Sequence, residues 1–155
     1  MPNWMEGTLK IRGTSENIVR FFTEGLGQPS GKYENAQMSE LVHDCSSAPY
    51  YEFAFENDPW VKDTHRAFLS GECEWEDDPD EPFTVLVDVR QAWKFKPDEW
   101  RDIAQKYNLN FRLYGFERGG QFCQEIEIRN GVITLYKIIR YEDWGWECPM
   151  PKMGG

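Results

Sequence analysis

The sequence has no long hydrophobic run. No stretch approaches the roughly 20 consecutive apolar residues that a helix needs to cross a bilayer, and no apolar segment of the kind found in secretory signals follows Met1. We therefore expect neither a membrane-spanning helix nor a secretory signal. The sequence therefore predicts a protein of the cytoplasm.

Histidine and cysteine are scarce, and their spacing does not suit a metal site or a catalytic site. The histidines are His43 and His65, and the cysteines are Cys45, Cys73, Cys123 and Cys148. The pair His43 and Cys45 lacks the second pair that structural zinc sites use. A nucleophile would have to find its histidine in an irregular part of the chain. We therefore expect no metal and free thiols in a reducing compartment.

Glycine-rich loops that bind phosphate groups or dinucleotides are also missing. Asp78 and Asp80 stand at alternate positions, but the glycine and the final glutamate of an EF-hand loop do not follow them. Because no catalytic or cofactor signature is present, we expect a protein that is not an enzyme and carries no cofactor.

Basic residues are in the minority. The 155 residues include 17 Lys and Arg against 27 Asp and Glu, a formal net charge of -10. Binding to a phosphate backbone requires clustered Lys and Arg, so this balance works against general nucleic-acid binding. It favours a basic partner, or it serves solubility alone.

The acidic residues concentrate between residues 72 and 81, with Trp75 among them. They are Glu72, Glu74, Glu76, Asp77, Asp78, Asp80 and Glu81. Because so many carboxylates cannot be buried without partners, we expect an exposed loop here. Acidic side chains around an aromatic residue can present a phosphate-like charge pattern to a basic groove. A solvated loop without a function is the alternative.

The region from 110 to 140 has the clearest local pattern, which is three alternating strands joined by turns at Gly119-Gly120 and Asn130-Gly131. Two-residue loops predict one buried face that pairs Phe111 with Ile128, Leu113 with Ile126, Ile126 with Leu135 and Ile128 with Ile133. The opposite face then pairs Arg112 with Glu127, and it places Tyr114, Glu125 and Tyr136 side by side. We expect a β-meander.

Alternation and helical spacing predict further elements before this meander. Strands are expected at 8–12, 50–55 and 83–95, and helices are expected after Thr14 and after Pro97. This order matches an α+β domain with a ferredoxin-like split βαβ layout. In that layout two helices cover one face of an antiparallel sheet, which the C-terminal meander extends. We expect a single domain over residues 1–155.

Three short motifs resemble the YubB ferredoxin-like family, which is typical of phages, plasmids and other mobile elements. They are Met1-Pro2-Asn3-Trp4 with Glu6-Gly7-Thr8-Leu9, then Tyr114-Gly115-Phe116-Glu117, and Tyr141-Glu142-Asp143. The similarity covers both ends and most of the chain after Phe83. Residues 28–82 then read as an insertion and 141–155 as an irregular tail. The family often has Cys where this chain has Met5, so no thiol role transfers to this position. The resemblance implies a fold and a setting, but no catalytic residues.

Two functional hypotheses follow. The first is a non-catalytic inhibitor that binds a basic host-defence protein, such as a CRISPR effector or a restriction nuclease, by imitating nucleic acid with the stretch at 72–81. The alternative is a module that binds single-stranded nucleic acid by stacking bases on the open sheet face. Its surface would consist of Arg112, Tyr114, Glu125 and Tyr136.

Overall fold

The computed structural model describes residues 1–27, 43–45, 48–78, 80 and 83–155, with side chains described from residue 50 onward after the first gap. The described residues form three helices: α1 (Ser15–Glu24), α2 (Pro97–Tyr107) and α3 (Trp144–Glu147). The strands are β1 (Trp4–Arg12), β2 (Leu26–Gly27), β3 (His43–Cys45), β4 (Ala48–Phe55), β5 (Trp60–Val61), β6 (Ala67–Glu76), β7 (Val85–Ala92), β8 (Asn110–Glu117), β9 (Phe122–Arg129) and β10 (Val132–Arg140).

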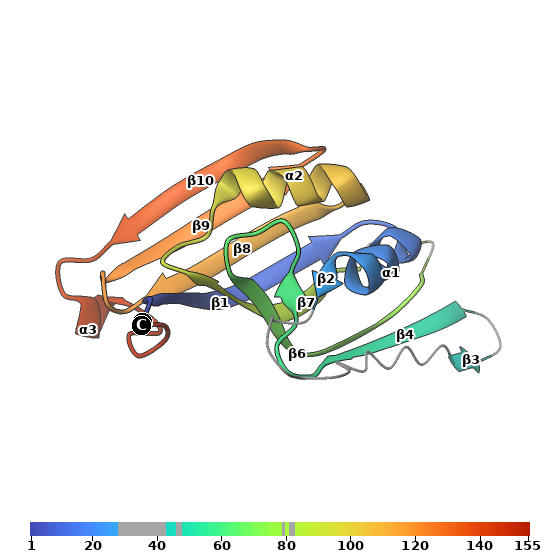
Figure 1. The fold of residues 1–155 in the computed structure, drawn as a ribbon, viewed down its shortest axis with the longest axis horizontal. Coiled ribbons are helices and arrows are strands. Elements are labelled where there is room, and N and C mark those ends of the chain that lie inside the picture. Colours follow the sequence, from blue (N-terminus) through green and yellow to red (C-terminus); the bar gives the residue numbers. More distant parts are fainter. Residues whose placement is uncertain (28–42, 46–47, 79, 81–82) are drawn as a thin grey trace.

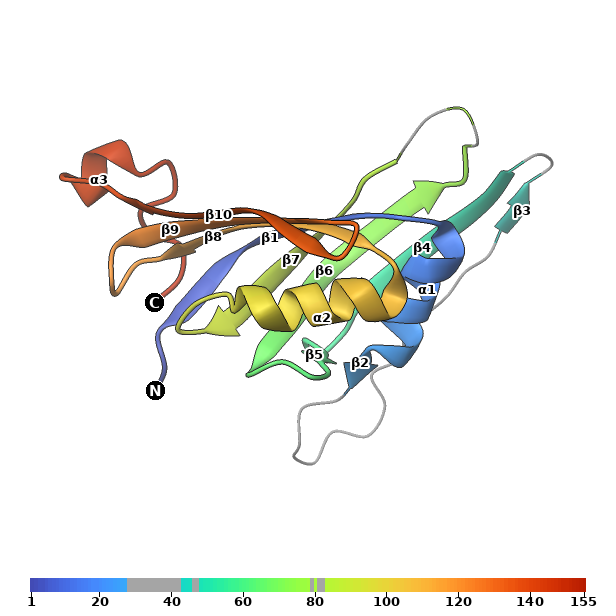
Figure 2. The same ribbon diagram turned by 90° about the horizontal axis from the view of Figure 1, so that it is seen from above.

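One large antiparallel sheet organises the molecule. Its main path runs β10-β9-β8-β1-β7-β6-β4-β3, and the short strands β2 and β5 join it at the side. Helices α1 and α2 lie on the same face of the sheet, whereas α3 lies on the other side (Figures 1 and 2). We call the face away from α1 and α2 the open face.

The predicted α+β, ferredoxin-like split βαβ fold is wrong. The structure is dominated by a ten-stranded sheet with three short helices. The physical reason lies in residues 43–76, which were expected to belong to an insertion but supply strands to the same sheet. Strand β6 pairs with β7 up to Ser70 and with β4 from Gly71 onward. Gly71 has a φ of 86° at this change of partner, a conformation that suits glycine.

Both longer helices lie where their sequence signals predict them. The side chain of Thr14 caps α1 by accepting a hydrogen bond from the amide of Asn17 at 3.2 Å. Helix α2 begins at Pro97 and is capped after Tyr107 by Asn108, which has the left-handed conformation (φ 52°, ψ 55°). Their buried sides pack on the sheet and form the main core.

The first hairpin of the meander has the predicted register. Phe111 pairs with Ile128, and Arg112 pairs with Glu127. The turn itself differs, because four residues separate the strands and Gln121, rather than either glycine, takes a positive φ of 54°. The buried carboxylate of Glu117 holds this turn by accepting the amides of Gly119 (2.7 Å) and Gly120 (2.6 Å).

The second hairpin departs from its predicted register after one pair. Asn130 and Gly131 have the positive φ values that a type I′ turn needs (51° and 73°). Ile133 then pairs with Ile128 as predicted, but a bulge at Thr134 follows. The Thr134 hydroxyl donates to Oε1 of Glu127 at 2.8 Å, which holds the additional residue in place.

The bulge overturns two predicted contacts. Ile126 pairs with Tyr136 instead of Leu135, and Glu125 pairs with Lys137 instead of Tyr136. Because side chains alternate between the faces of a sheet, the one-residue shift moves Tyr136 to the face that carries the helices.

The C-terminal segment folds back over one end of the open face. A second, smaller core forms there from Phe116, Cys123, Trp144 and Cys148. The chain end is fixed by the Trp144 Nε1 bond to the carbonyl of Pro151 (2.9 Å) and by the amide of Gly155, which donates to the carbonyl of Trp4 (2.9 Å). Among the described residues, no helix is both long enough and apolar enough to cross a membrane.

Candidate partner-binding surface

A row of carboxylates crosses the open face on two neighbouring strands. We define the acidic row as Glu72, Glu74 and Glu76 of β6 with Glu52 of β4. The three β6 side chains are exposed and alternate with buried residues, and Glu52 is half-buried. Glu52 and Glu74 lie directly opposite each other in the ladder. The acidic row is therefore held on regular strands.

The expected exposed loop is thus wrong for residues 72–76. These residues belong to β6, and only one side of the strand is acidic. Asp77 and Asp78 follow the strand; Asp78 and Asp80 are exposed, and the amide of Asp80 donates to Oδ1 of Asp78 at 2.8 Å. Glu81 lies outside the described residues.

Trp75 does not belong to the surface. Its side chain is 5% exposed and lies on the helix-covered face of β6. Its ring stacks on Tyr51 (centroids 5.0 Å apart) and on Phe53 (5.7 Å). The indole Nε1 donates to the Ser15 hydroxyl at 2.8 Å. Trp75 therefore belongs to the core and is not an anchor for a partner.

Asp77 also has a structural contact. The hydroxyl of Ser15 donates to the Asp77 carboxylate, so Trp75, Ser15 and Asp77 form a chain of hydrogen bonds between β6 and α1. A change of Asp77 would disturb this chain, and tests of surface charge should leave Asp77 intact.

The carboxylates of the acidic row have no ion pair with any cation in the part of the chain that the structure describes. The one side-chain partner found there is Tyr50, whose hydroxyl donates to Glu74. This hydrogen bond is the main reason why the pKa of Tyr50 is raised to about 12. Asp88, exposed on β7 and opposite Ser70, adds another carboxylate to the same face.

The alternative surface is not assembled as expected. Arg112 pairs with Glu125 and with Glu127, where the second distance is 3.4 Å. Tyr114 packs into the second core beneath the C-terminal segment, and burial raises its pKa to about 12. Tyr136 lies on the opposite face because of the bulge. The structure therefore does not bring the two tyrosines together as a stacking platform for bases.

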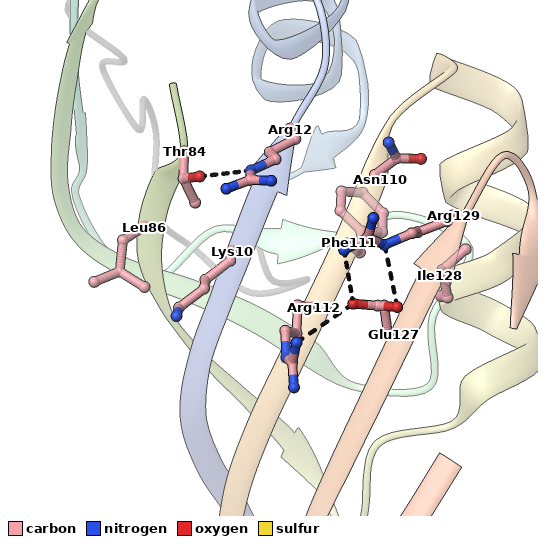
Figure 3. Close-up of a pocket in the computed structure, with 10 residues that line it drawn as sticks. All are labelled: Lys10, Arg12, Thr84, Leu86, Asn110, Phe111, Arg112, Glu127, Ile128 and Arg129. Atoms are coloured by element: carbon pink, nitrogen blue, oxygen red, sulfur yellow. Dashed lines mark hydrogen bonds and ion pairs between the residues drawn. The ribbon is translucent and has the colours of Figure 1, made fainter. Parts of the chain in front are cut away.

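A cationic groove on the open face was not anticipated from the sequence. It lies between β7, β1, β8 and β9 and has a volume of about 460 Å³ (Figure 3). Its charged lining residues are Lys10, Arg12, Arg112, Arg129 and Glu127. The alternation of Lys10 and Arg12 along the first strand could have indicated that one side of this strand is basic. The sequence could not show that β1, β8 and β9 bring their charged side chains together.

Three cysteines are free thiols in the described part of the chain, and all three are buried: Cys73, Cys123 and Cys148. Burial raises the pKa of Cys73 and that of Cys123 to about 12. Cys45 and His43 have no described side chains. Among the described residues, no group of three or more His, Cys, Asp or Glu is placed to share a metal ion.

The raised pKa values predict slow thiol chemistry in the folded protein. Because the thiolate is the reactive form, Cys73 and Cys123 should react slowly near pH 8, and the rate should rise as the pH approaches 12. After unfolding without a reductant, all four cysteines should titrate with a thiol reagent. Fast modification of Cys73 or Cys123 in the native protein, or fewer than four thiols after unfolding, would contradict this prediction.

Comparisons of this chain with family models, with curated proteins and with solved structures found no match. The similarity to the YubB family therefore stays an interpretation of its short motifs. The function has to be inferred from the surface of the chain itself.

Proposed function

We propose that the protein binds a basic nucleic-acid-binding protein through the acidic row and so keeps nucleic acid from that partner. One observation carries this proposal: the acidic row stands on an ordered sheet without a cation partner among the described residues. A basic groove on another protein would supply the missing positive charge.

The opposed pair Glu52 and Glu74 works against folding. Like charges directly opposite in a ladder are destabilising. At other places in the sheet opposite charges face each other across the ladder, as with Arg112 and Glu127 and with Lys137 and Glu125. Local choices that oppose the fold concentrate at functional sites. This contrast supports a role for the acidic row outside the fold itself.

The geometry of β6 suits imitation of a charged backbone. Alternate residues on one side of a strand are about 6.8 Å apart, so Glu72, Glu74 and Glu76 form a regular, rigid line of charge. A rigid line loses less conformational entropy on binding than a mobile acidic tail would lose. Asp78 and Asp80 continue the negative charge beyond the strand.

The class of partner rests on the family resemblance. A mobile-element protein that binds a basic host protein would act inside the bacterial cell against a defence nuclease, such as a CRISPR effector or a restriction nuclease. In this proposal the protein is an inhibitor without catalytic activity and without a cofactor.

The proposal can be tested in DNA-cleavage reactions with a panel of such nucleases. For the true partner, inhibition should be competitive with DNA. Inhibition should also weaken as salt is added, because salt shortens the Debye length, which is about 10 Å at 0.1 M. Inhibition that does not depend on DNA concentration or on salt would show that the protein acts by another route.

A further inference from the structure

We propose that the cationic groove is a binding site for a small ligand that carries a phosphate group, of nucleotide size or smaller. This site is separate from the acidic row, although both lie on the open face. The proposal rests on the charges of the groove, on how they are held, on the shape of the groove and on its surroundings.

The groove is mainly cationic, although the chain as a whole is acidic. Four cationic side chains and one carboxylate line it, in a protein with a net charge of -10. Lys10 and Arg112 lie directly opposite each other on β1 and β8. Glu125 and Glu127 already pair with Arg112, whereas Lys10 has no ion pair among the described residues. A bound anion would supply Lys10 with the counter-charge that Arg112 already has.

Two of the cations, Arg112 and Arg129, are already held in place. Glu127 contacts Arg129 (Nε to Oε1, 3.1 Å) and Arg112 (NH1 to Oε2, 3.4 Å), as Figure 3 shows. The hydrogen bond from Thr134 and the contact with Arg129 lower the pKa of Glu127, so this anchor stays charged at neutral pH. Side chains that are fixed before binding lose less entropy when a ligand arrives.

The free donors point to the ligand class. Arg12 donates through Nε to the hydroxyl of Thr84 at 2.8 Å, and its two terminal nitrogens have no partner among the described residues. Lys10 has no ion pair there either. A guanidinium fork binds two oxygens of one phosphate, and a lysine adds a point charge. A phosphate with nearly two negative charges suits this set better than a single carboxylate.

The shape of the groove limits the size of the ligand. A volume of about 460 Å³ lies in the range of small-molecule sites, about 300–1,000 Å³. Leu86, half exposed at the side of the groove, offers an apolar surface for the body of a phosphate ester (Figure 3). Phe111 also lines the groove, but its side chain is only 1% exposed, so Leu86 is the main apolar surface that a ligand can reach.

The surroundings exclude a nucleic-acid strand. On one side, Asp88 lies on β7 and the acidic row lies on β6 beyond it. On the other side, the C-terminal segment covers Tyr114 of β8. A chain of phosphates that left the groove would meet the carboxylates on the first side or the C-terminal segment on the second. A single phosphate group would not.

NMR titration of the full chain with inorganic phosphate, adenosine monophosphate and adenosine tests this proposal. Both phosphate compounds should bind saturably, with a Kd of about 1 mM or tighter, and should shift the amides of Lys10, Arg12, Thr84 and Asn110. Adenosine should not bind. The double variant Lys10→Gln/Arg12→Gln should weaken binding at least about tenfold.

The control variant Lys94→Gln/Lys152→Gln removes the same charge at two exposed positions outside the groove and should change the Kd less than about twofold. Unfolding curves of both variants check that the fold is kept. No saturable binding, or equal weakening in the two double variants, would overturn the site. If a short oligothymidylate binds more tightly than adenosine monophosphate, the groove binds a nucleic-acid strand, and the proposal of a small ligand is wrong.

Discussion

Replacement of Trp75 by alanine is expected to cost about 3–5 kcal/mol of unfolding free energy. The side chain is 5% exposed and packs between aromatic rings of β4 and α1. Its removal leaves a large cavity, and the Ser15 hydroxyl loses a donor. Urea unfolding followed by circular dichroism measures the loss. Trp75→Phe should cost less, because it keeps one aromatic ring in the core and loses the hydrogen bond and only part of the packing.

Trp146 offers a matched control for this change. Its side chain is 86% exposed, so Trp146→Ala should change stability by no more than about 0.5 kcal/mol. If Trp75→Ala unfolds like the parent protein and loses only partner binding, the indole is at the surface and the placement of β6 is wrong.

The position of Trp75 shows where sequence reasoning failed and why. Leu69, Cys73 and Trp75 share one side of β6, which is the period-two signal of a strand. The other side carries Glu72, Glu74 and Glu76. High charge was interpreted as evidence for a loop, although a strand at an open sheet face can be acidic on one side without burying any carboxylate.

The features that were predicted correctly depend on local chemistry. Thr14 caps α1, Asn108 ends α2, and Asn130 with Gly131 forms the tight turn. Each of these signals involves residues that are a few positions apart. The first hairpin also has the predicted pairs, because its four-residue turn extends the expected two-residue turn by one residue on each side and so keeps the register.

The features that were missed depend on single side-chain contacts or on distant pairing. The bulge at Thr134 is held by a hydrogen bond from its hydroxyl to Glu127 on the neighbouring strand β9. The partner change at Gly71 joins β6 to both β7 and β4. The cationic groove needs β1, β8 and β9 side by side. A single sequence does not reveal such convergence, since strand order is set by long-range pairing.

Neutralisation of the acidic row is expected to weaken partner binding by well over tenfold. The variant Glu72→Gln/Glu74→Gln/Glu76→Gln keeps the size of each side chain and leaves Asp77 with its Ser15 contact. A tenfold loss corresponds to about 1.4 kcal/mol. The fold should be kept and should gain slightly in stability, because the repulsion between Glu52 and Glu74 disappears. Unfolding curves check this second expectation independently of any partner.

The most direct measurement compares this variant with a matched one in binding to the inhibited nuclease. Glu24→Gln/Glu56→Gln/Glu142→Gln removes the same charge at exposed positions outside the acidic row. We expect its Kd to stay within about threefold of the parent value, since distant surface charges are largely screened at physiological salt. The acidic-row variant should lose well over tenfold at the same salt concentration. If the two variants weaken binding equally, net charge alone acts and the acidic row is not the binding surface.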